Sequence, residues 1–417
     1  MRTRYLLPLL LSLCLLSFVP RPARADDPVA MNNYGLELLQ QGEVDRALEQ
    51  FQKANSYFPY DPVIKKNLAM AYAHVAKKKM RGSDFTGAVD DLDRALELDP
   101  DERPFLVLKG IASYYLKRYD TARDCLERGM PESGDGWDAL YYLGWVSYDT
   151  DDLAKALEYW EKARALQPDN PELKTQIAKV KRELAVQPGR DTGYSSRFRI
   201  TYDAAVSSSL ADAVLDELES AYNRVGADLD CYPEGDVAVA LYTLKEFRGV
   251  TQGPEWSGGI FDGKIRLPIG GVTEMNPHLR AVLDHEYAHV VIFGITGGNC
   301  PTWLNEGIAQ VEELRQGDPL SRLLEGAARK GGIIPWKALE GSFMSFGTQQ
   351  AALAYEESYA AVRYLVDTYG WYKVKQVLVN LGNGMTPAQA FARAFDDYGL
   401  DYAALEREWR ASLPAGE

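Results

Sequence analysis

The segment His285-Glu286-Tyr287-Ala288-His289 says more about this 417-residue chain than any other stretch of comparable length. It follows Asn276-Pro277, which combines a helix-capping residue with a favourable first helical residue. Apolar residues at helical spacing predict a helix that runs to about Phe293 and stops at Gly294. Because the two histidines are four positions apart, both imidazoles leave the same helix face, where they can bind one metal ion. The chain has four histidines in all, so half of them belong to this pattern.

A third metal ligand is available in the next segment, Thr302-Trp303-Leu304-Asn305-Glu306-Gly307-Ile308-Ala309. A glycine-rich turn and a proline precede it, so a second helix can fold back and offer the Glu306 carboxylate. Two histidines, a glutamate and one open position are typical of a catalytic zinc site, whereas four protein ligands close a structural one. Gly307 inside a helix costs about 1 kcal/mol relative to alanine. Close helix–helix approach at the metal would explain that glycine.

These motifs resemble those of the gluzincin metallopeptidases, and residues 195–417 are similar to the peptidase MA-like domains of that group. The resemblance implies a hydrolase with one Zn²⁺ per chain, Glu286 as general base, and three ligands, His285, His289 and Glu306. It also implies that Asn305 orients a ligand histidine. Some gluzincins place an aspartate four residues after the ligand glutamate to hold the first histidine. Gln310 occupies that position here, so the partner of His285 stays open.

The resemblance further implies a tyrosine or histidine that stabilises the oxyanion. Tyr355 is the first choice and Tyr359 the second, and the alternative is that both tyrosines only pack. Zincins bind the substrate backbone as a strand added to a sheet edge. The edge strand is expected around Lys264–Leu267 or Gly258–Phe261, and the sequence does not distinguish them.

The region before the metal-binding motif has the pattern of a small mixed sheet. Phe198–Tyr202 and Val237–Tyr242 are predicted strands, and Leu210–Val225 is a predicted amphipathic helix between them. Asp262-Gly263 between two alternating runs predicts a tight hairpin. The second half is therefore expected to be an α+β domain with a small mixed sheet followed by helices.

The first half of the chain is a helical repeat array. One copy has Gly35, Ala47, Phe51, Ala54 and Pro59 at offsets that recur in a later copy. The later set is Gly144, Ala156, Trp160, Ala163 and Pro168. A period of about 34 residues resembles the tetratricopeptide repeat (TPR). We expect an all-α solenoid over residues 26–187 with about four repeats.

Two details of the array can be predicted. The second copy carries about seven extra residues near Lys77–Ser83, which are expected between its two helices. A final helix, Pro171–Val186, is expected to cap the stack, because an open solenoid end exposes apolar surface. Residues 188–194 break the helical pattern and are expected to form a linker. The array is expected to bind a peptide or partner protein on its concave face, and the alternative is a spacer.

The amino terminus has the pattern of a targeting segment. Basic residues, a short apolar run and the sequence Ala23-Arg24-Ala25 predict a signal peptide over residues 1–25 and export to the periplasm or beyond. The alternatives are an uncleaved anchor and a lipoprotein modified at Cys14. A disulfide between Cys231 and Cys300 and two free thiols are equally open.

Charge excludes one class of function. The chain has 60 acidic and 46 basic side chains and a net charge of −14, which argues against nucleic acid as a partner. The resulting prediction is an exported zinc metallopeptidase whose repeats recruit a peptide or protein substrate or a partner. The alternatives are a cell-envelope scaffold with a vestigial or slow zinc site, and a hydrolase of a non-peptide amide.

Overall fold

The computed structural model describes residues 27–187, 189–203, 206–251, 259–314, 321–343 and 346–414. The expected signal peptide, residues 1–25, lies outside the described residues, as does Gly258. In the described ranges no helix is both long enough and apolar enough to cross a membrane.

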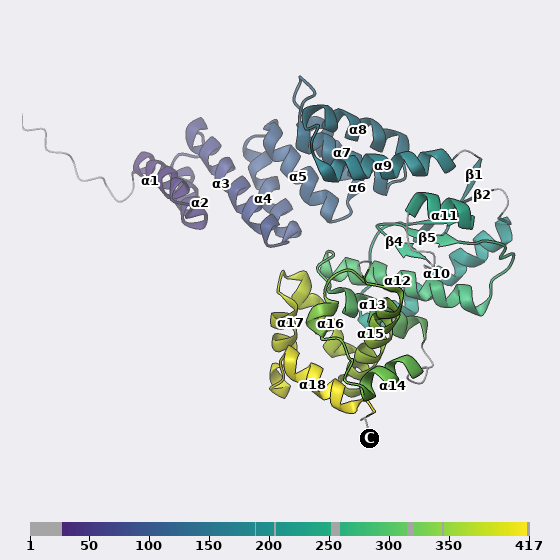
Figure 1. Ribbon diagram of the computed structural model, residues 1–417. Coiled ribbons are helices and arrows are strands. Elements are labelled where there is room, and N and C mark those ends of the chain that lie inside the picture. The colour runs from purple at the N-terminus through teal and green to yellow at the C-terminus, as the bar shows by residue number, and fades with distance from the viewer. Residues whose placement is uncertain are drawn as a thin grey trace, which may run out of the picture.

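The first half of the chain forms an extended solenoid, drawn purple to teal in Figure 1. Its helices are α1 (Pro28–Gln40), α2 (Val44–Tyr57), α3 (Pro62–Arg81), α4 (Phe85–Leu98), α5 (Arg103–Tyr115), α6 (Tyr119–Gly129), α7 (Trp137–Asp149), α8 (Leu153–Leu166) and α9 (Pro171–Val186). Helices α1 to α8 pack in four consecutive pairs, and α9 packs on α8. The all-α repeat architecture is confirmed, and α9 has the bounds expected for the capping helix.

The turn inside each pair repeats with the sequence. Gly42, Ser83, Lys117 and Asp151 all have positive φ there. Ser83, Lys117 and Asp151 follow one another at intervals of 34 positions, and the interval from Gly42 to Ser83 is seven residues longer. The extra residues do not form the expected insertion between helices. They extend α3, which has 20 residues, because this segment has helix-forming residues and no breaker before Gly82.

Close packing explains the glycines of the repeat. A Cβ at Gly144 would lie 2.2 Å from the indole nitrogen of Trp160, and one at Gly35 would lie 2.8 Å from the Phe51 ring. The large residue of the second helix therefore fills the space left by the glycine of the first, as the repeat pattern predicts.

The second half is an α+β domain, as expected. Its sheet consists of β1 (Arg190–Tyr194), β2 (Phe198–Asp203), β3 (Val237–Tyr242), β4 (Ile260–Phe261) and β5 (Ile265–Pro268). Its helices are α10 (Ser208–Leu229), α11 (Leu244–Thr251), α12 (Pro277–Thr296), α13 (Thr302–Glu313), α14 (Arg322–Arg329), α15 (Thr348–Tyr369), α16 (Trp371–Gly382), α17 (Pro387–Ala394) and α18 (Tyr402–Ser412), with short 3₁₀ turns at Trp336–Leu339 and Asp396–Tyr398.

The sheet has the order β1-β2-β3-β5-β4. The three central strands are parallel to one another, and both edge strands are antiparallel to their neighbours. The sequence left open whether Lys264–Leu267 or Gly258–Phe261 forms the edge strand. β4, which ends at Phe261, is at the edge of the sheet. The prediction of a linker at 188–194 is wrong, because most of this segment forms strand β1, which pairs with β2.

Two element boundaries also differ from expectation. Helix α12 continues past Gly294 to Thr296, and Gly297 in the left-handed region ends it. Gly294 lies inside the helix, and a Cβ added there would make only an ordinary contact, 3.6 Å from the Pro233 side chain. The hairpin between β4 and β5 has three connecting residues instead of two, because Phe261 pairs with Ile265.

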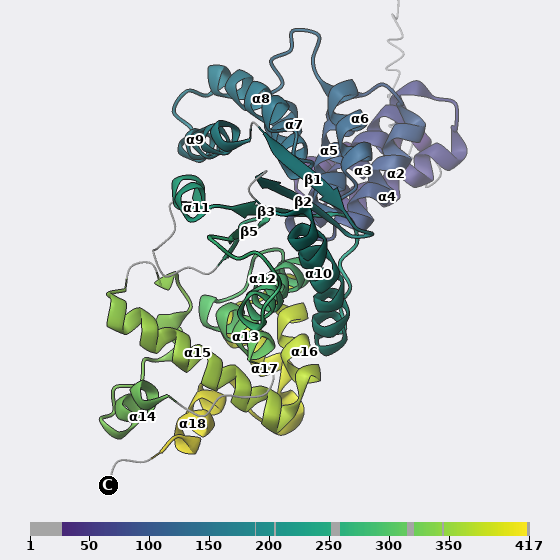
Figure 2. The same cartoon turned by 90° about the vertical axis from the view of Figure 1, so that its right-hand side faces the viewer.

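The sheet is covered on both faces, as Figure 2 shows. Ile265 and Leu267 point into the large core formed with α10 and α12. Lys264 and Arg266, one position out of phase, point to the opposite face and are buried against the end of the solenoid. The period of two in a strand therefore separates an apolar face from a charged face, and the solenoid covers the charged one.

Candidate metal centre

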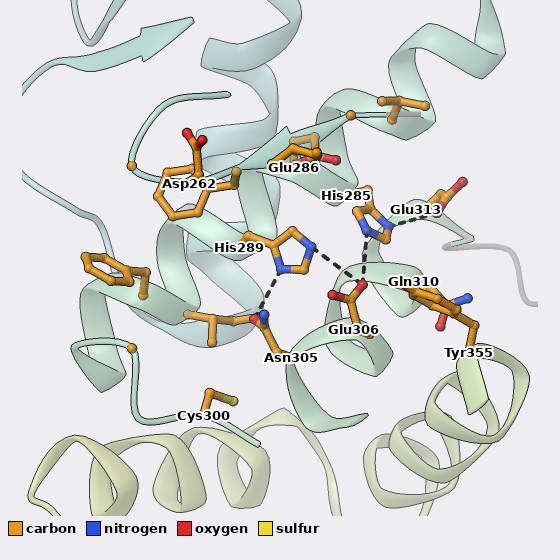
Figure 3. Close-up of a pocket in the computed structure, with 18 of the residues that line it drawn as sticks. Asp262, His285, Glu286, His289, Cys300, Asn305, Glu306, Gln310, Glu313 and Tyr355 are labelled. Carbon is orange, nitrogen blue, oxygen red and sulfur yellow. Dashed lines mark hydrogen bonds and ion pairs between the residues drawn. The ribbon is translucent and has the colours of Figure 1, made fainter. Parts of the chain in front are cut away.

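Two neighbouring helices carry the side chains of the site. His285, Glu286 and His289 are on α12, and Asn305 and Glu306 are on α13, which packs beside it. In Figure 3 both histidine rings point toward the Glu306 carboxylate. The turn from Gly297 to Pro301 reverses the chain between the helices, as the glycine-rich sequence predicts.

The three expected ligand residues lie together. One ligand atom each from His285, His289 and Glu306 falls within 4.8 Å of the others. The Nε2 atoms of His285 and His289 are 3.7 Å and 3.8 Å from the same Glu306 oxygen. Ligand atoms around a tetrahedral zinc ion are separated by about 3.4 Å, given bonds of about 2.0–2.1 Å. The donor set and its spacing therefore fit zinc.

Each histidine is oriented through its other ring nitrogen. His289 Nδ1 is 3.1 Å from Asn305 Oδ1, and His285 Nδ1 is 2.9 Å from Glu313 Oε2. An Nδ1–H donated to each oxygen leaves both Nε2 atoms available as ligands. Gln310 lines the cavity but does not hold His285. Glu313, seven residues after Glu306 on the same face of α13, was not recognised from the sequence. Two helical turns of spacing could have identified it.

Charge within the site favours a cation. Burial disfavours a charged His285, but hydrogen bonds to Glu306 and Glu313 outweigh it and raise the pKa of His285 to about 10. Burial lowers the pKa of His289. Burial would raise the pKa of Glu306, but the two histidines outweigh it, and that pKa is lowered. A metal ion entering the site must displace the His285 proton, so binding would release a proton.

Glu286 is buried beside this cluster, with 4% of the residue exposed. Burial raises the pKa of Glu286 to about 8. Its Oε2 atom is buried and has no hydrogen-bond partner among the described residues. A buried carboxyl oxygen without a partner costs about 1–3 kcal/mol, and a polar ligand or water in the cavity would remove that cost.

The cavity above the three ligand residues has a volume of about 730 Å³. β4 and its turn form one wall, through residues 259–263. The main chain at Gly259 passes close to Glu286, because an added Cβ there would lie 2.5 Å from Glu286 Oε1. Strand β4 therefore begins directly beside Glu286, and a side chain at the preceding Gly259 would force Glu286 to shift.

Of the two tyrosines considered for the oxyanion, the structure brings only Tyr355 to the cavity. Burial, followed by the Glu306 and Glu286 carboxylates, raises the pKa of Tyr355. Tyr359 is 7% exposed, belongs to the hydrophobic core and does not line the cavity. Both lie on α15. Gly307 makes a close helix–helix approach, as expected, but to α15, because a Cβ there would lie 2.4 Å from the Ser358 carbonyl oxygen.

Cys300 also lines the cavity, and burial raises the pKa of its thiol. Cys125, Cys231 and Cys300 are all free thiols. The structure therefore has no disulfide between Cys231 and Cys300.

Comparisons with known proteins agree with both halves of the chain. Residues 227–415 match the model of the peptidase MA superfamily, and residues 137–170 match that of the tetratricopeptide repeat. The chain therefore contains a peptidase MA superfamily domain and a TPR repeat. The peptidase MA superfamily match suggests peptidase activity, and the TPR match implies protein–protein interaction.

Individual relatives cover part of the chain. DnaJ homolog subfamily C member 7 of Homo sapiens and of Mus musculus is 31% identical over 104 residues, 25% of this chain. The chain spans about a fifth of the length of those relatives, 21%. Among solved structures, MamA from Desulfovibrio magneticus is 22% identical, with 38% of this chain and 85% of that chain covered and a TM-score of 0.32. YrrB, described as a TPR protein with an unusual peptide-binding site, is 16% identical, with 39% and 80% covered and a TM-score of 0.33.

Proposed function

We propose that this protein is an exported, zinc-dependent metallopeptidase of the gluzincin type, and that its TPR repeats recruit the substrate or a partner protein. The observation that carries the proposal is the convergence of His285, His289 and Glu306 within 4.8 Å at one cavity. Glu286 beside them is the general base of this proposal. The superfamily match over residues 227–415 supports the same class.

Each residue of the site has a separate role in this proposal. His285, His289 and Glu306 would hold one zinc ion, which supplies Lewis-acid chemistry by acidifying a water molecule and polarising a carbonyl. Glu286 would take a proton from the attacking water and return it to the leaving amine. Without a metal ion, burial raises the pKa of Glu286 to about 8, and the positive charge of a cation held by the neighbouring ligands would lower it toward neutral pH, where the carboxylate can accept a proton.

Two further groups would position the substrate. The Tyr355 hydroxyl would donate a hydrogen bond to the developing oxyanion, and burial keeps that hydroxyl protonated. The outer edge of β4, the last strand of the described sheet, would pair with the substrate backbone as an added strand. Because β4 borders the cavity, a strand added there would run past Glu286.

The test compares the wild-type chain with the Glu286→Gln and His285→Ala variants. Metal analysis is paired with cleavage of a peptide library. We expect one zinc per chain and cleavage in the wild type, one zinc without cleavage in Glu286→Gln, and neither in His285→Ala. Stoichiometric zinc without cleavage by the wild type would favour a scaffold instead. Retained cleavage in Glu286→Gln would remove Glu286 from its role.

Export is proposed from residues 1–25 alone. Amino-terminal sequencing of the processed protein should begin at Asp26. A chain that retains Met1 in the membrane fraction would point to an uncleaved anchor.

A further inference from the structure

A second cavity, of about 460 Å³, lies on the solenoid, between α5 and α7. Its lining is dominated by aromatic rings: Tyr114, Tyr115, Trp137, Tyr141, Tyr142 and Trp145. The remaining lining residues are the acids Asp138 and Glu172. A pocket with many π faces, two carboxylates and no basic residue in its lining is complementary to a cation.

The rings are held at fixed angles to one another. Trp137 stacks on Tyr141 with centroids 4.8 Å apart, and Tyr141 and Tyr142 are perpendicular. Tyr142 contacts the edges of Tyr114 and Tyr115 as well. Rings preorganised in this way lose little conformational entropy when a ligand enters.

The polar groups of these tyrosines are already engaged. The Tyr141 hydroxyl donates to Glu172 Oε1 at 2.7 Å, and the Tyr115 and Tyr142 hydroxyls pair with each other at 3.2 Å. The Tyr141 proton is therefore committed to Glu172, and the Tyr115–Tyr142 pair keeps one of its two O–H groups free, so these three hydroxyls offer a single donor for the carbonyl groups of a proline-rich peptide. The Asp138 carboxylate, the second Glu172 oxygen and the ring faces outside the Trp137–Tyr141 stack remain for recognition, which favours a cationic side chain.

The aromatic pocket is next to the metal cavity. The Lys117 ammonium lies 5.5 Å from the centroid of the Tyr114 ring and 5.7 Å from that of the Phe293 ring. Tyr114 lines the aromatic pocket and Phe293 lines the metal cavity. Lys117 itself pairs with Asp149 at 3.4 Å, so its charge is compensated. Lining residues of the two cavities therefore flank one lysine side chain, close enough for a single extended peptide to contact both.

We propose that the aromatic pocket binds a lysine or arginine side chain of a peptide, and that this peptide is the substrate. The second part rests on the proposed function, and the first part does not. The net charge of −14 favours encounter with a basic peptide at low salt.

Binding is tested in the full chain carrying Glu286→Gln, so that no peptide is consumed. The probes are short random-flank peptides with one fixed lysine or arginine, and the same peptides with Nε-acetyl-lysine or citrulline. We expect binding of the charged peptides and at least about tenfold weaker binding of the neutral ones, a difference of 1.4 kcal/mol. Glu172→Gln and Tyr115→Leu should each weaken binding of the charged peptides by a similar factor.

The matched control is Glu158→Gln on α8, an exposed acid of the solenoid that pairs with Lys162 and does not line the pocket. It should leave the dissociation constant unchanged. Equal affinity for charged and neutral peptides, preference for a proline-rich uncharged peptide, or an equal effect of Glu158→Gln would overturn the proposal. Circular dichroism of each variant separates loss of the pocket from loss of the fold.

Cleavage by the wild type distinguishes the two proposals. If the chain is a peptidase, Glu172→Gln should raise KM for lysine-containing peptides and leave kcat unchanged. If the charged peptides bind and none is cleaved, the pocket stands and the peptidase proposal fails. If peptides are cleaved without a preference for a basic residue, the pocket proposal fails and the peptidase stands.

Discussion

Glu183 at the end of the solenoid and Arg266 in the sheet form an ion pair of 3.0 Å in which both side chains are at most 3% exposed. Tyr148 of α7 accepts a hydrogen bond from the same guanidinium at 2.6 Å. Arg266 also donates to Asp262, which lines the metal cavity. A chain of charge contacts therefore runs from the capping helix of the repeats to one wall of the site.

Breaking this pair should destabilise the protein more than breaking a surface pair. Glu183→Gln leaves the buried Arg266 with one carboxylate fewer, and the expected loss is about 3 kcal/mol in the free energy of unfolding. Glu158→Gln is the control, because Glu158 pairs with Lys162 at 2.6 Å and its side chain is 58% exposed. Its loss should stay below about 1 kcal/mol. Urea unfolding measures both, and equal losses would mean that the buried pair contributes no more than a surface pair.

Glu313 is expected to hold His285 in place without binding the metal. Glu313→Ala should weaken zinc affinity about 10- to 100-fold while the stoichiometry stays at one zinc per chain. Glu313→Gln keeps an acceptor for His285 Nδ1–H and should recover part of the affinity. Competition with a chelator measures the affinity, and Glu325→Ala on α14 is the control. An unchanged affinity in Glu313→Ala would contradict this role.

Two helical glycines should respond in opposite directions to alanine. At Gly307 a Cβ would lie 2.4 Å from the Ser358 carbonyl oxygen, so Gly307→Ala should cost about 1–3 kcal/mol through overpacking. At Gly326 on α14 there is open space within 4 Å. Gly326→Ala should therefore stabilise by up to about 1 kcal/mol. Thermal unfolding provides the comparison, and a shift in the same direction for both would be inconsistent with the packing.

Glu357 should make stability depend on pH. Its side chain is fully buried, and burial raises the pKa of Glu357 from 4.5 to about 7. Because the folded pKa is the higher one, the stabilising contribution is complete below pH 4.5 and is lost as the pH rises through about 7. A shift of that size corresponds to at most about 3 kcal/mol.

The Glu357→Gln variant keeps an acceptor for the Ile334 N–H and cannot ionise. It should be more stable than the wild type at pH 8 and similar to it at pH 4.5. Urea unfolding at both values is the measurement. A constant difference between the two proteins across this range would show that Glu357 is not the titrating group.

The sequence by itself was sufficient to predict the local elements of the site and of the repeats. Spacing of four along a helix puts His285 and His289 on one face whatever the rest of the chain does. The same holds for the repeat, where Gly144 and Trp160 must meet because the period places a small residue opposite a large one. The strand Val237–Tyr242 and the helix Pro171–Val186 followed from alternation, caps and breakers.

Only the tertiary structure decided which groups from distant segments meet. Lys264 and Arg266 alternate with apolar residues and so have the pattern of a solvent-facing strand side, yet the solenoid covers them, because Asp151 and Glu183 lie opposite. Tyr355 lines the cavity and Tyr359 does not, because of how α15 is rotated against α13. The approach of the aromatic pocket to the metal cavity likewise depends on how the repeats dock on the sheet. Periodicity constrains one element at a time, whereas packing between elements is fixed by the complementarity of surfaces far apart in the chain.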